Sequence, residues 1–365
     1  MRGPVWLARA GFSACQESAM GAFERMAAHD YGELHLMRDA GSGLEAIVAL
    51  HDVRLGPGLG GTRFLAYQGE QEAVVDALRL ARGMTYKAAL AGLSLGGGKA
   101  VIIKPAGEFD RNALLLAFGR FVDALGGRYI TTEDSGIAVA DVEVMRQATK
   151  HVVGLPRAAG GAGDPSPFTA LGVRRGIEAC VKLKLEREAL EGIRVAVAGV
   201  GAVGYWLCDE LQRLGAKLVV ADVDSERAAA ARQQFGAEVV SPSEIHRVRC
   251  DVYAPCALGA VLNDATIPEL ACSIVGGAAN NQLAEARHGE ALQERGILYA
   301  PDYAINAGGL INVAQELYGY DENKSRSRVM KIYDTIHDVV ERSLGSGQLP
   351  HTIADAMVEA RLAQA

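Results

Sequence analysis

The sequence contains no uninterrupted apolar run of the roughly 18 residues that a membrane-spanning helix requires. It has no CxxC pair: its six cysteines are scattered, mostly among aliphatic neighbours, which is typical of buried small side chains in a reducing compartment. It also lacks a basic excess, since the net charge is −7, so nucleic acid is not an expected ligand. We therefore predict a cytoplasmic protein without a metal site that binds neither membranes nor nucleic acid.

What the sequence has in abundance is glycine, with 43 among 365 residues, and apolar side chains, at 49 %. A chain of this length exceeds one ordinary hydrophobic core, which predicts two domains. Residues 1–19 carry Arg2 and Arg9 but no acid before Glu17. We interpret them as a disordered extension and Met20 as the start of the folded protein.

Lys87 and Lys99 frame a segment of small and apolar residues, and three consecutive glycines, 96–98, lead into Lys99. We expect a helix at 72–93 and a buried strand at 101–103. Glycines let another group approach the backbone closely, and burial lowers the pKa of an ammonium, so the lysines suit carboxylate binding and base catalysis. The alternative is a helix–turn–strand connection with two solvated lysines.

Two further stretches are candidates for a binding site. Residues 56–63 are dense in glycine and are expected to form a loop whose N–H groups cradle an anion, or else a plain turn. Asp134 follows a predicted strand at 128–132 and is well placed to face a cleft. The alternative for Asp134 is an N-cap of the helix expected from Val139.

The most specific motif is Gly199-Val200-Gly201-Ala202-Val203-Gly204, a GxGxxG pattern between a predicted strand at 194–198 and a predicted helix at 205–214. A second strand, at 217–221, ends in Asp222, which lies 18 residues after the last glycine. A strand, this loop, a helix and a closing acid together indicate a dinucleotide-binding site.

Each position of this motif has a distinct physical role. Gly199 permits the tight turn, Gly201 lets the pyrophosphate approach the backbone at the helix N-terminus, and Gly204 lets helix and strand pack closely. Asp222 would accept hydrogen bonds from the adenosine ribose and repel a 2′-phosphate, which favours NAD over NADP.

The ends of later strands supply further candidates, because ligands bind at the carboxyl ends of parallel strands. Cys256 and Ala257 follow one expected strand, and Asn281 follows another, although a turn-stabilising asparagine is the alternative there. Thr169 begins a predicted helix, which it could cap while it presents its hydroxyl to a ligand.

In this order, the motifs resemble the leucine/valine/phenylalanine/glutamate dehydrogenase family of NAD(P)-dependent amino acid dehydrogenases, most closely its leucine dehydrogenase branch. The resemblance extends from residue 20 to the C-terminus. The stretches that carry it are 55–63, the Lys87 and Lys99 segments, 132–134, 199–204, 254–259 and 300–312. It implies an α/β fold with a Rossmann-type, doubly wound dinucleotide-binding domain, an α/β substrate domain with a mixed sheet, and a cleft between them.

The resemblance implies oxidative deamination: hydride leaves the α-carbon for NAD, and the imino acid is hydrolysed to a 2-oxo acid and ammonia. Lys87, with N–H groups near Gly60 and Gly61, would bind the α-carboxylate. Lys99 would be catalytic, and Asp134 would exchange protons with the amino nitrogen. Positions near the nicotinamide or the cleft would be Thr169, Asn281 and Asn306.

The family's side-chain pocket corresponds to Leu59, Thr132, Leu310 and Val313. Leu310 and Thr132 are larger than the valine and alanine expected there, so we predict a small pocket that favours leucine, valine or isoleucine. Phenylalanine dehydrogenase is the alternative within the class. An inactive NAD-binding regulatory protein is the alternative outside it.

The implied domains are a substrate and oligomerisation domain at 20–150 and an NAD-binding domain at 151–309, with C-terminal helices at 310–365 that return to the first domain. Members of the family are usually homo-oligomers, often octamers. We therefore expect self-association, besides an amino acid substrate and a 2-oxo acid product.

Overall fold

The computed structural model describes residues 21–365, which form two compact units. The first comprises residues 21–85 and 95–152, and the second comprises residues 86–94 and 153–365. The extension predicted at 1–19 lies outside the described residues. Because residues 310–365 group with the second unit here, their predicted return to the substrate domain stays a prediction.

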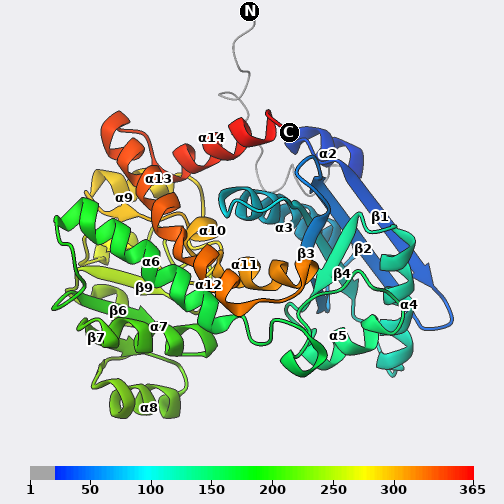
Figure 1. Cartoon of the computed structure of the whole chain (residues 1–365), viewed down its shortest axis with the longest axis horizontal. Coiled ribbons are helices and arrows are strands. Elements are labelled where there is room, and N and C mark those ends of the chain that lie inside the picture. The colour runs from blue at the N-terminus through cyan, green and yellow to red at the C-terminus, as the bar shows by residue number, and fades with distance from the viewer. Residues whose placement is uncertain (1–20) are drawn as a thin grey trace, which may run out of the picture. The chain divides into compact units, whose positions relative to one another are not determined.

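The first unit is built on a five-stranded mixed sheet in the order β1-β2-β4-β3-β5, with α3 and α4 on opposite sides (Figure 1). Its strands are antiparallel between β1, β2 and β4 and parallel between β4, β3 and β5. Its elements are α2 (Ala22–His29), β1 (Glu33–Asp39), β2 (Leu44–Asp52), β3 (Gly58–Leu65), α3 (Glu70–Leu90, which continues into the second unit), β4 (Gly96–Ile103), α4 (Arg111–Ala124), β5 (Tyr129–Thr132) and α5 (Val139–Arg146).

The glycine-rich stretches of this unit are strands, so the loop predicted at 56–63 is wrong and the strand predicted at 101–103 begins earlier, at Gly96. The reason is close packing: a Cβ at Gly60 would lie 1.8 Å from the Gly98 carbonyl oxygen of the neighbouring strand, and helix α3 approaches the sheet closely at Gly97. A Cβ at Gly97 would lie 2.2 Å from the Thr85 nitrogen and 2.3 Å from the Ala81 carbonyl oxygen of α3. Glycine is normally unfavourable inside a strand, but here only glycine leaves room for the helix.

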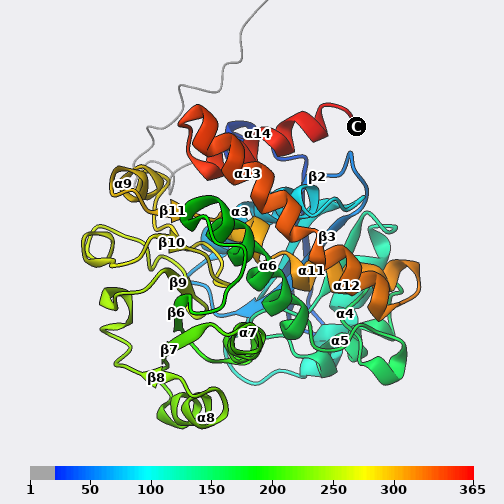
Figure 2. The same ribbon diagram turned by 60° about the vertical axis from the view of Figure 1, so that its left-hand side comes forward.

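The second unit is built on a six-stranded parallel sheet, and Figure 2 shows its order, β11-β10-β9-β6-β7-β8. The predicted strands at 194–198 and 217–221 are confirmed as β6 and β7. Its helices and strands are α6 (Ser166–Leu185), β6 (Arg194–Ala198), α7 (Ala202–Arg213), β7 (Lys217–Ala221), α8 (Ser225–Phe235), β8 (Glu238–Val239), β9 (Val252–Pro255), β10 (Ile274–Val275), α9 (His288–Glu294), β11 (Leu298–Tyr299), α10 (Asp302–Ile305), α11 (Gly308–Ala314), α12 (Glu322–Met330), α13 (Ile332–Ser346) and α14 (Pro350–Leu362).

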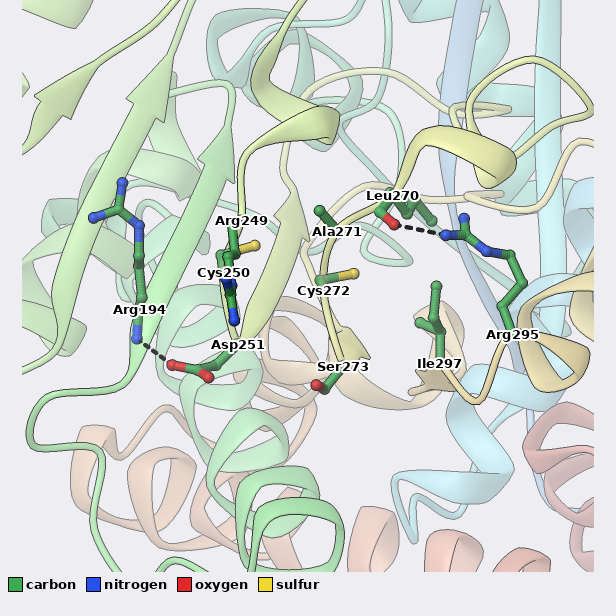
Figure 3. A pocket seen from close by; sticks show the side chains of 10 residues that line it. All are labelled: Arg194, Arg249, Cys250, Asp251, Leu270, Ala271, Cys272, Ser273, Arg295 and Ile297. Carbon is green, nitrogen blue, oxygen red and sulfur yellow. Dashed lines mark hydrogen bonds between the residues drawn. The ribbon is translucent and has the colours of Figure 1, made fainter.

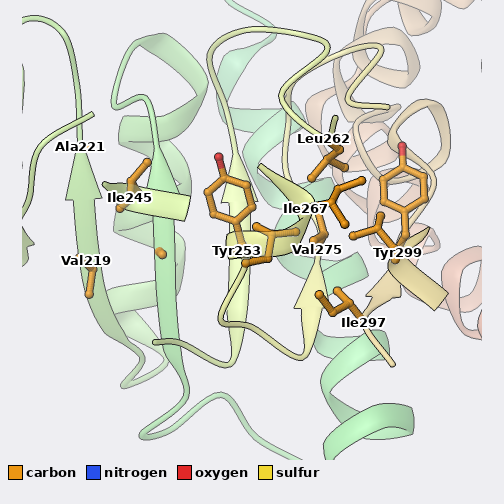
Figure 4. Close-up of a cluster of buried hydrophobic side chains, with 12 residues drawn as sticks. Val219, Ala221, Ile245, Tyr253, Leu262, Ile267, Val275, Ile297 and Tyr299 are labelled. Carbon is orange, nitrogen blue, oxygen red and sulfur yellow. The ribbon is translucent and has the colours of Figure 1, made fainter. Parts of the chain in front are cut away.

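One face of this sheet is covered by a cluster of buried side chains (Figure 4). Alternate residues of a strand share a face, and Val219 and Ala221 of β7 both belong to the cluster, as do Tyr253 of β9 and Val275 of β10. Packing against this apolar face stabilises the sheet and so fixes where the carboxyl ends of its strands lie. Together the mixed sheet and the parallel sheet confirm the predicted α/β fold class. Within residues 21–365, no helix is both long and apolar enough to cross a bilayer.

Candidate functional site

In the first unit, Lys99 and Asp134 form a direct ion pair, with the Lys99 ammonium donating to Asp134 Oδ2. Lys99 lies on β4, and Asp134 follows the end of β5, so the two residues come from the two neighbours of β3. Lys99 is only 4 % exposed. The two residues predicted to be catalytic therefore meet across the strand that separates them.

Gly61, on that intervening strand, makes the contact possible. A Cβ at this position would lie 2.8 Å from Asp134 Cβ and 3.2 Å from Asp134 Oδ2. Any side chain at Gly61 would occupy the path along which Asp134 reaches Lys99. Gly60 is equally constrained, because its Cβ would lie 1.8 Å from the carbonyl oxygen of Gly98. Packing thus explains both glycines, and their predicted N–H contacts to a substrate carboxylate stay a prediction.

The electrostatics of the pair favour an ammonium that can lose its proton. Burial lowers the pKa of Lys99 against the opposing effect of the Asp134 charge, and the nearby Arg63 charge lowers it further. Burial would raise the pKa of Asp134, but the charge and hydrogen bond of Lys99, the Ser135 N–H and the Arg63 charge outweigh it and bring that pKa to about 2. Asp134 therefore stays ionised while Lys99 is the group poised to titrate.

Arg63 was missed by sequence reasoning. Its Nε lies 3.5 Å from Asp134 Oδ1, and its Nη1 donates to both carboxylate oxygens of Asp76 at 3.0 Å. Tyr67 donates to Asp76 Oδ2 at 2.7 Å. The signal was present in the sequence, since Arg63 lies two residues after Gly61, but it is meaningful only if this stretch is a strand with alternating faces.

The predicted pocket residues Leu59 and Thr132 lie close to this pair. Leu59 is 1 % exposed and precedes Gly61 by two residues, so the two share a face of β3. Thr132 is the register partner of Gly61, and its buried hydroxyl has no hydrogen-bond partner among the described residues. A small apolar surface with one hydroxyl therefore adjoins the ion pair.

The second unit contains the GxGxxG loop at the carboxyl end of β6. Gly199 has φ +98°, and its Cβ would lie 2.6 Å from Ala257 Cβ; a Cβ at Gly204 would lie 1.9 Å from the Gly199 carbonyl oxygen. Helix α7 begins at Ala202, and Val203 follows in its first turn. The tight turn and the close helix–strand packing predicted for these glycines are both present.

The same loop fits a dinucleotide. A Cβ at Gly201 would meet only Arg227 Nη1, at 3.6 Å, so the space beside this backbone is open to a pyrophosphate. Asp222 Oδ2 accepts the N–H of Val200 at 2.8 Å, and its Oδ1 accepts the N–H of Asp224 at 2.9 Å. Asp222 thus holds the loop in shape at the end of β7, where a ribose would lie.

Cys256 and Ala257 follow β9 and lie against the glycine loop. The Cys256 N–H donates to the Ala198 carbonyl at 2.8 Å, and Cys256 Cβ lies 3.5 Å from the Cβ position of Gly204. Burial raises the pKa of the Cys256 thiol to about 12, so this side chain is not a nucleophile near neutral pH. Both residues line the loop rather than perform chemistry.

Lys87 is part of a polar network within the second unit. Its Nζ donates to Asn280 Oδ1 at 3.0 Å, and Asn306 Nδ2 donates to the same oxygen at 2.7 Å. The neighbouring Asn281 has φ +51°, a left-handed conformation that asparagine tolerates. Lys87 and Asn306, both predicted to be site residues, are therefore joined through Asn280. Sequence reasoning passed over Asn280 in favour of its neighbour.

Thr169 lies beside the start of α11, the helix that carries Leu310 and Val313. The helix predicted to begin at Thr169 begins at Ser166, so the predicted cap is wrong: Thr169 lies in the first turn of α6 and its Oγ1 donates to the Pro165 carbonyl at 3.1 Å. That Oγ1 would lie 2.6 Å from a Cβ at Gly309. Val313 is buried, and Leu310 is partly exposed. The second unit therefore places these three predicted residues around the same helix start.

Two other features of the second unit do not belong to this site. Asp264, Glu285 and His288 have potential metal-ligand atoms within 4.8 Å of one another, but Arg287 pairs with both carboxylates. His288 Nδ1 also accepts the N–H of Glu285 at 2.9 Å, which leaves its proton on Nε2, facing Asp264. This cluster is an ion-pair network.

A hollow of about 640 Å³ lies where the strands of the parallel sheet begin, and Figure 3 shows the residues that line it. Arg194, Arg249 and Arg295 contribute to its lining, together with Cys250 and Cys272. Dinucleotides and substrates bind at the carboxyl ends of parallel strands. The hollow therefore lies at the opposite end of this sheet from the glycine loop.

Comparisons with known proteins agree with this geometry. The family model described as "Glu/Leu/Phe/Val dehydrogenase, dimerisation domain" matches residues 32–151, and the model described as "Glutamate/Leucine/Phenylalanine/Valine dehydrogenase" matches residues 221–360. The leucine dehydrogenase of Geobacillus stearothermophilus is 50 % identical over 343 residues, which is 94 % of each chain. The valine dehydrogenase of Streptomyces albus is 47 % identical over 90 % of this chain and 92 % of its own.

Among solved structures, the L-tryptophan dehydrogenase of Nostoc punctiforme superposes with a TM-score of 0.84 and 45 % identity, over 94 % of this chain and 98 % of its own. A hetero-hexameric glutamate dehydrogenase from Thermus thermophilus, at 23 % identity and a TM-score of 0.73 over 91 % of this chain and 88 % of its own, shares the fold. The resemblance inferred from the motifs is thus confirmed.

Proposed function

The chain belongs to the glutamate/leucine/phenylalanine/valine dehydrogenase family and is an amino acid dehydrogenase, and we propose that it oxidatively deaminates leucine, valine or isoleucine with NAD. The observation that carries this proposal is the ion pair between the buried Lys99 and the partly buried Asp134, beside Leu59 and Thr132. These residues supply a titratable base, a carboxylate and a small apolar surface for an aliphatic side chain.

The reaction requires two proton transfers that the first unit can perform. The α-amino group must be neutral before hydride can leave, and the ionised Asp134 carboxylate can accept its proton. Water must then attack the imino carbon. Lys99, whose pKa is lowered by burial, can take a proton from that water and stabilise the resulting oxygen.

The second unit would hold the cofactor. We propose that Gly201 and the first turn of α7 bind the pyrophosphate and that Asp222 accepts hydrogen bonds from the adenosine ribose, which disfavours a 2′-phosphate. A bound nicotinamide supplies the hydride acceptor. Lys87, oriented by Asn280, would bind the substrate carboxylate, and Thr169, Asn281 and Asn306 would border the nicotinamide.

We propose in addition a cytoplasmic homo-oligomer. The support for self-association is the match of residues 32–151 to a model described as a dimerisation domain.

The test is NADH formation by the purified chain with leucine, valine, isoleucine, phenylalanine, tryptophan and glutamate, each with NAD and with NADP. We expect aliphatic substrates and NAD to give the highest kcat/KM. In Lys99→Ala, kcat should fall on the order of 10³-fold, the usual contribution of a general base. The variant should still bind NADH, as measured by a change in NADH fluorescence. Lys104→Ala, an exposed lysine just after β4, is the matched control.

A second candidate substrate class is aromatic, because an L-tryptophan dehydrogenase from Nostoc punctiforme is 49 % identical over 87 % of this chain and 90 % of its own. A higher kcat/KM with tryptophan or phenylalanine than with leucine would support this class. An NAD-binding regulatory protein would bind NADH but oxidise none of the six amino acids.

A further inference from the structure

Arg63 lies on the same face of β3 as Gly61, beside the ion pair. The parallel register that pairs Gly61 with Thr132 continues past the end of β5, since the Phe64 N–H donates to the Ser135 carbonyl at 2.9 Å. This register brings Arg63 level with Asp134, and its Nε lies 3.5 Å from Asp134 Oδ1. Asp134 is thus flanked by two cations, with Lys99 on one oxygen and Arg63 on the other.

Asp76, on α3, anchors the side chain of Arg63. Asp76 accepts from Arg63 Nη1 with both of its oxygens at 3.0 Å, and Tyr67 donates to Asp76 at 2.7 Å. Burial and the Asp76 hydrogen bond raise the pKa of Tyr67 well above its usual value, so the hydroxyl remains a donor. The guanidinium therefore has a fixed position and a permanent charge.

This arrangement addresses a difficulty in the proposed reaction. When Lys99 loses its proton, Asp134 loses the cation that compensates its partly buried charge, and a charge withdrawn from water without a partner is unfavourable. Arg63 cannot lose its proton. It therefore still compensates Asp134 after Lys99 has become neutral.

We propose that Arg63 is a positioning residue that holds the Asp134 carboxylate in place and ionised when Lys99 gives up its proton, with Asp76 and Tyr67 as its anchor. The proposal rests on the proposed function of the Lys99–Asp134 pair and assigns a role to three residues outside that pair. The positive charge of Arg63 lets Lys99 become neutral at a lower pH than the Lys99–Asp134 pair alone would allow.

The charges around Lys99 determine the direction in which each substitution shifts the pKa of Lys99. Asp134, beyond β5, and Asp76, on α3, favour its charged form, whereas Arg63, on β3, disfavours it. Arg63→Gln should therefore move the ascending limb of the pH–kcat/KM profile to higher pH by roughly one unit, the effect of one nearby charge. Asp76→Asn should move the same limb to lower pH, since it removes a negative charge and keeps an oxygen that accepts from Arg63.

Catalytic rates should follow a different order. Arg63→Gln should lower kcat about tenfold on the ascending limb, below the wild-type optimum, because one pKa unit there corresponds to a tenfold change in the reactive fraction, with a smaller effect on KM. Arg63→Lys keeps the positive charge but not the guanidinium contacts with Asp76. It should therefore keep the wild-type position of the pH limb but only part of the wild-type kcat. Tyr67→Phe should leave the pH limb in place and lower kcat less than Arg63→Gln.

The control is Arg120→Gln on the exposed side of α4, which should change neither profile. An unchanged pH limb in folded Arg63→Gln, or shifts of the same sign in Arg63→Gln and Asp76→Asn, would overturn the proposal. If Arg63→Gln does not fold, the pH profiles of Asp76→Asn and Arg63→Lys test the proposal instead. A shift of the ascending limb of Asp76→Asn to higher pH would contradict the proposal.

A second readout separates this inference from the proposed function. Competitive acetylation of the full chain, followed by peptide mass spectrometry, measures how the reactivity of Lys99 depends on pH, with the exposed Lys217 as internal reference. Arg63→Gln should raise the apparent pKa of Lys99 even if no amino acid is oxidised. Wild-type inactivity with all six amino acids would refute only the proposed function, whereas an unchanged Lys99 titration in Arg63→Gln would refute only the role of Arg63.

Discussion

The two units assemble their polar sites in different ways. In the second unit the glycine loop is continuous in sequence, and Asp222 closes it 22 positions after Val200. In the first unit the ion pair joins Lys99 on β4 to Asp134 after β5. The two residues are 35 positions apart in the sequence, and strand β3 lies between them. The loop depends mainly on local backbone conformation, whereas the pair depends on strand order and on the absence of a side chain at Gly61.

The substitution Gly61→Ala tests most directly whether the ion pair depends on the absence of a side chain at this position. The added Cβ would lie 2.4 Å from the Glu133 carbonyl oxygen and 2.8 Å from Asp134 Cβ, so Asp134 must move away from Lys99. We expect a loss of about 100-fold in kcat/KM, since a displacement near 1 Å is enough for this, with unchanged NADH binding by fluorescence. Gly83→Ala is the control: its Cβ would meet nothing within 4 Å. Full activity in Gly61→Ala would contradict the assigned packing.

The pH dependence of stability tests the pair without catalysis. The pKa of Asp134 falls from 3.8 to about 2 on folding, so its contribution to the free energy of unfolding is complete above pH 4 and is lost as the pH falls towards 2. Relative to Asp134→Asn, the wild type should lose up to about 2 kcal/mol between pH 5 and pH 2. Urea unfolding of both proteins measures this, and parallel pH curves would show that Asp134 is not held by Lys99.

For the second unit, the corresponding change is Asp222→Ala. It leaves the N–H groups of Val200 and Asp224 without their acceptor. NADH affinity should fall about tenfold, the cost of one or two such bonds, and discrimination against NADPH should weaken with the lost charge. Asp338→Ala, which removes an exposed ion pair on α13, is the control. Unchanged affinity for both cofactors would argue against a role in ribose binding.

The smallest expected effect concerns Asp164, which lies just before α6. Its Oδ1 accepts the N–H of Ser166 at 2.8 Å, and an asparagine oxygen can accept the same bond. Asp164→Asn should therefore change the free energy of unfolding by less than about 0.5 kcal/mol, whereas Asp164→Ala should cost about 1 kcal/mol. Thermal unfolding of both variants measures the difference, and equal losses would show that this bond does not stabilise the helix start.

The glycine loop shows how much of this protein could be predicted from the sequence. Strands 194–198 and 217–221, the turn at Gly199 and the acid at Asp222 follow from local patterns, because a βα unit places all of them within about 30 residues. The same local reasoning assigned residues 56–63 to a loop, since glycine is disfavoured in strands. What it could not include was the packing of β3 against its neighbours, which leaves no room for a Cβ at Gly60 or Gly61.

By itself, the sequence determined the α/β class, the dinucleotide motif and the identity of Lys99 and Asp134 as candidate catalytic residues, since these are properties of hydrophobic period, glycine spacing and motif order. Only the tertiary structure decided that Lys99 and Asp134 touch across Gly61 and that Arg63 and Asp76 stand beside them. The physical reason is that strand order in a mixed sheet is set by packing between distant segments, and no local pattern records which side chains that packing brings to one face.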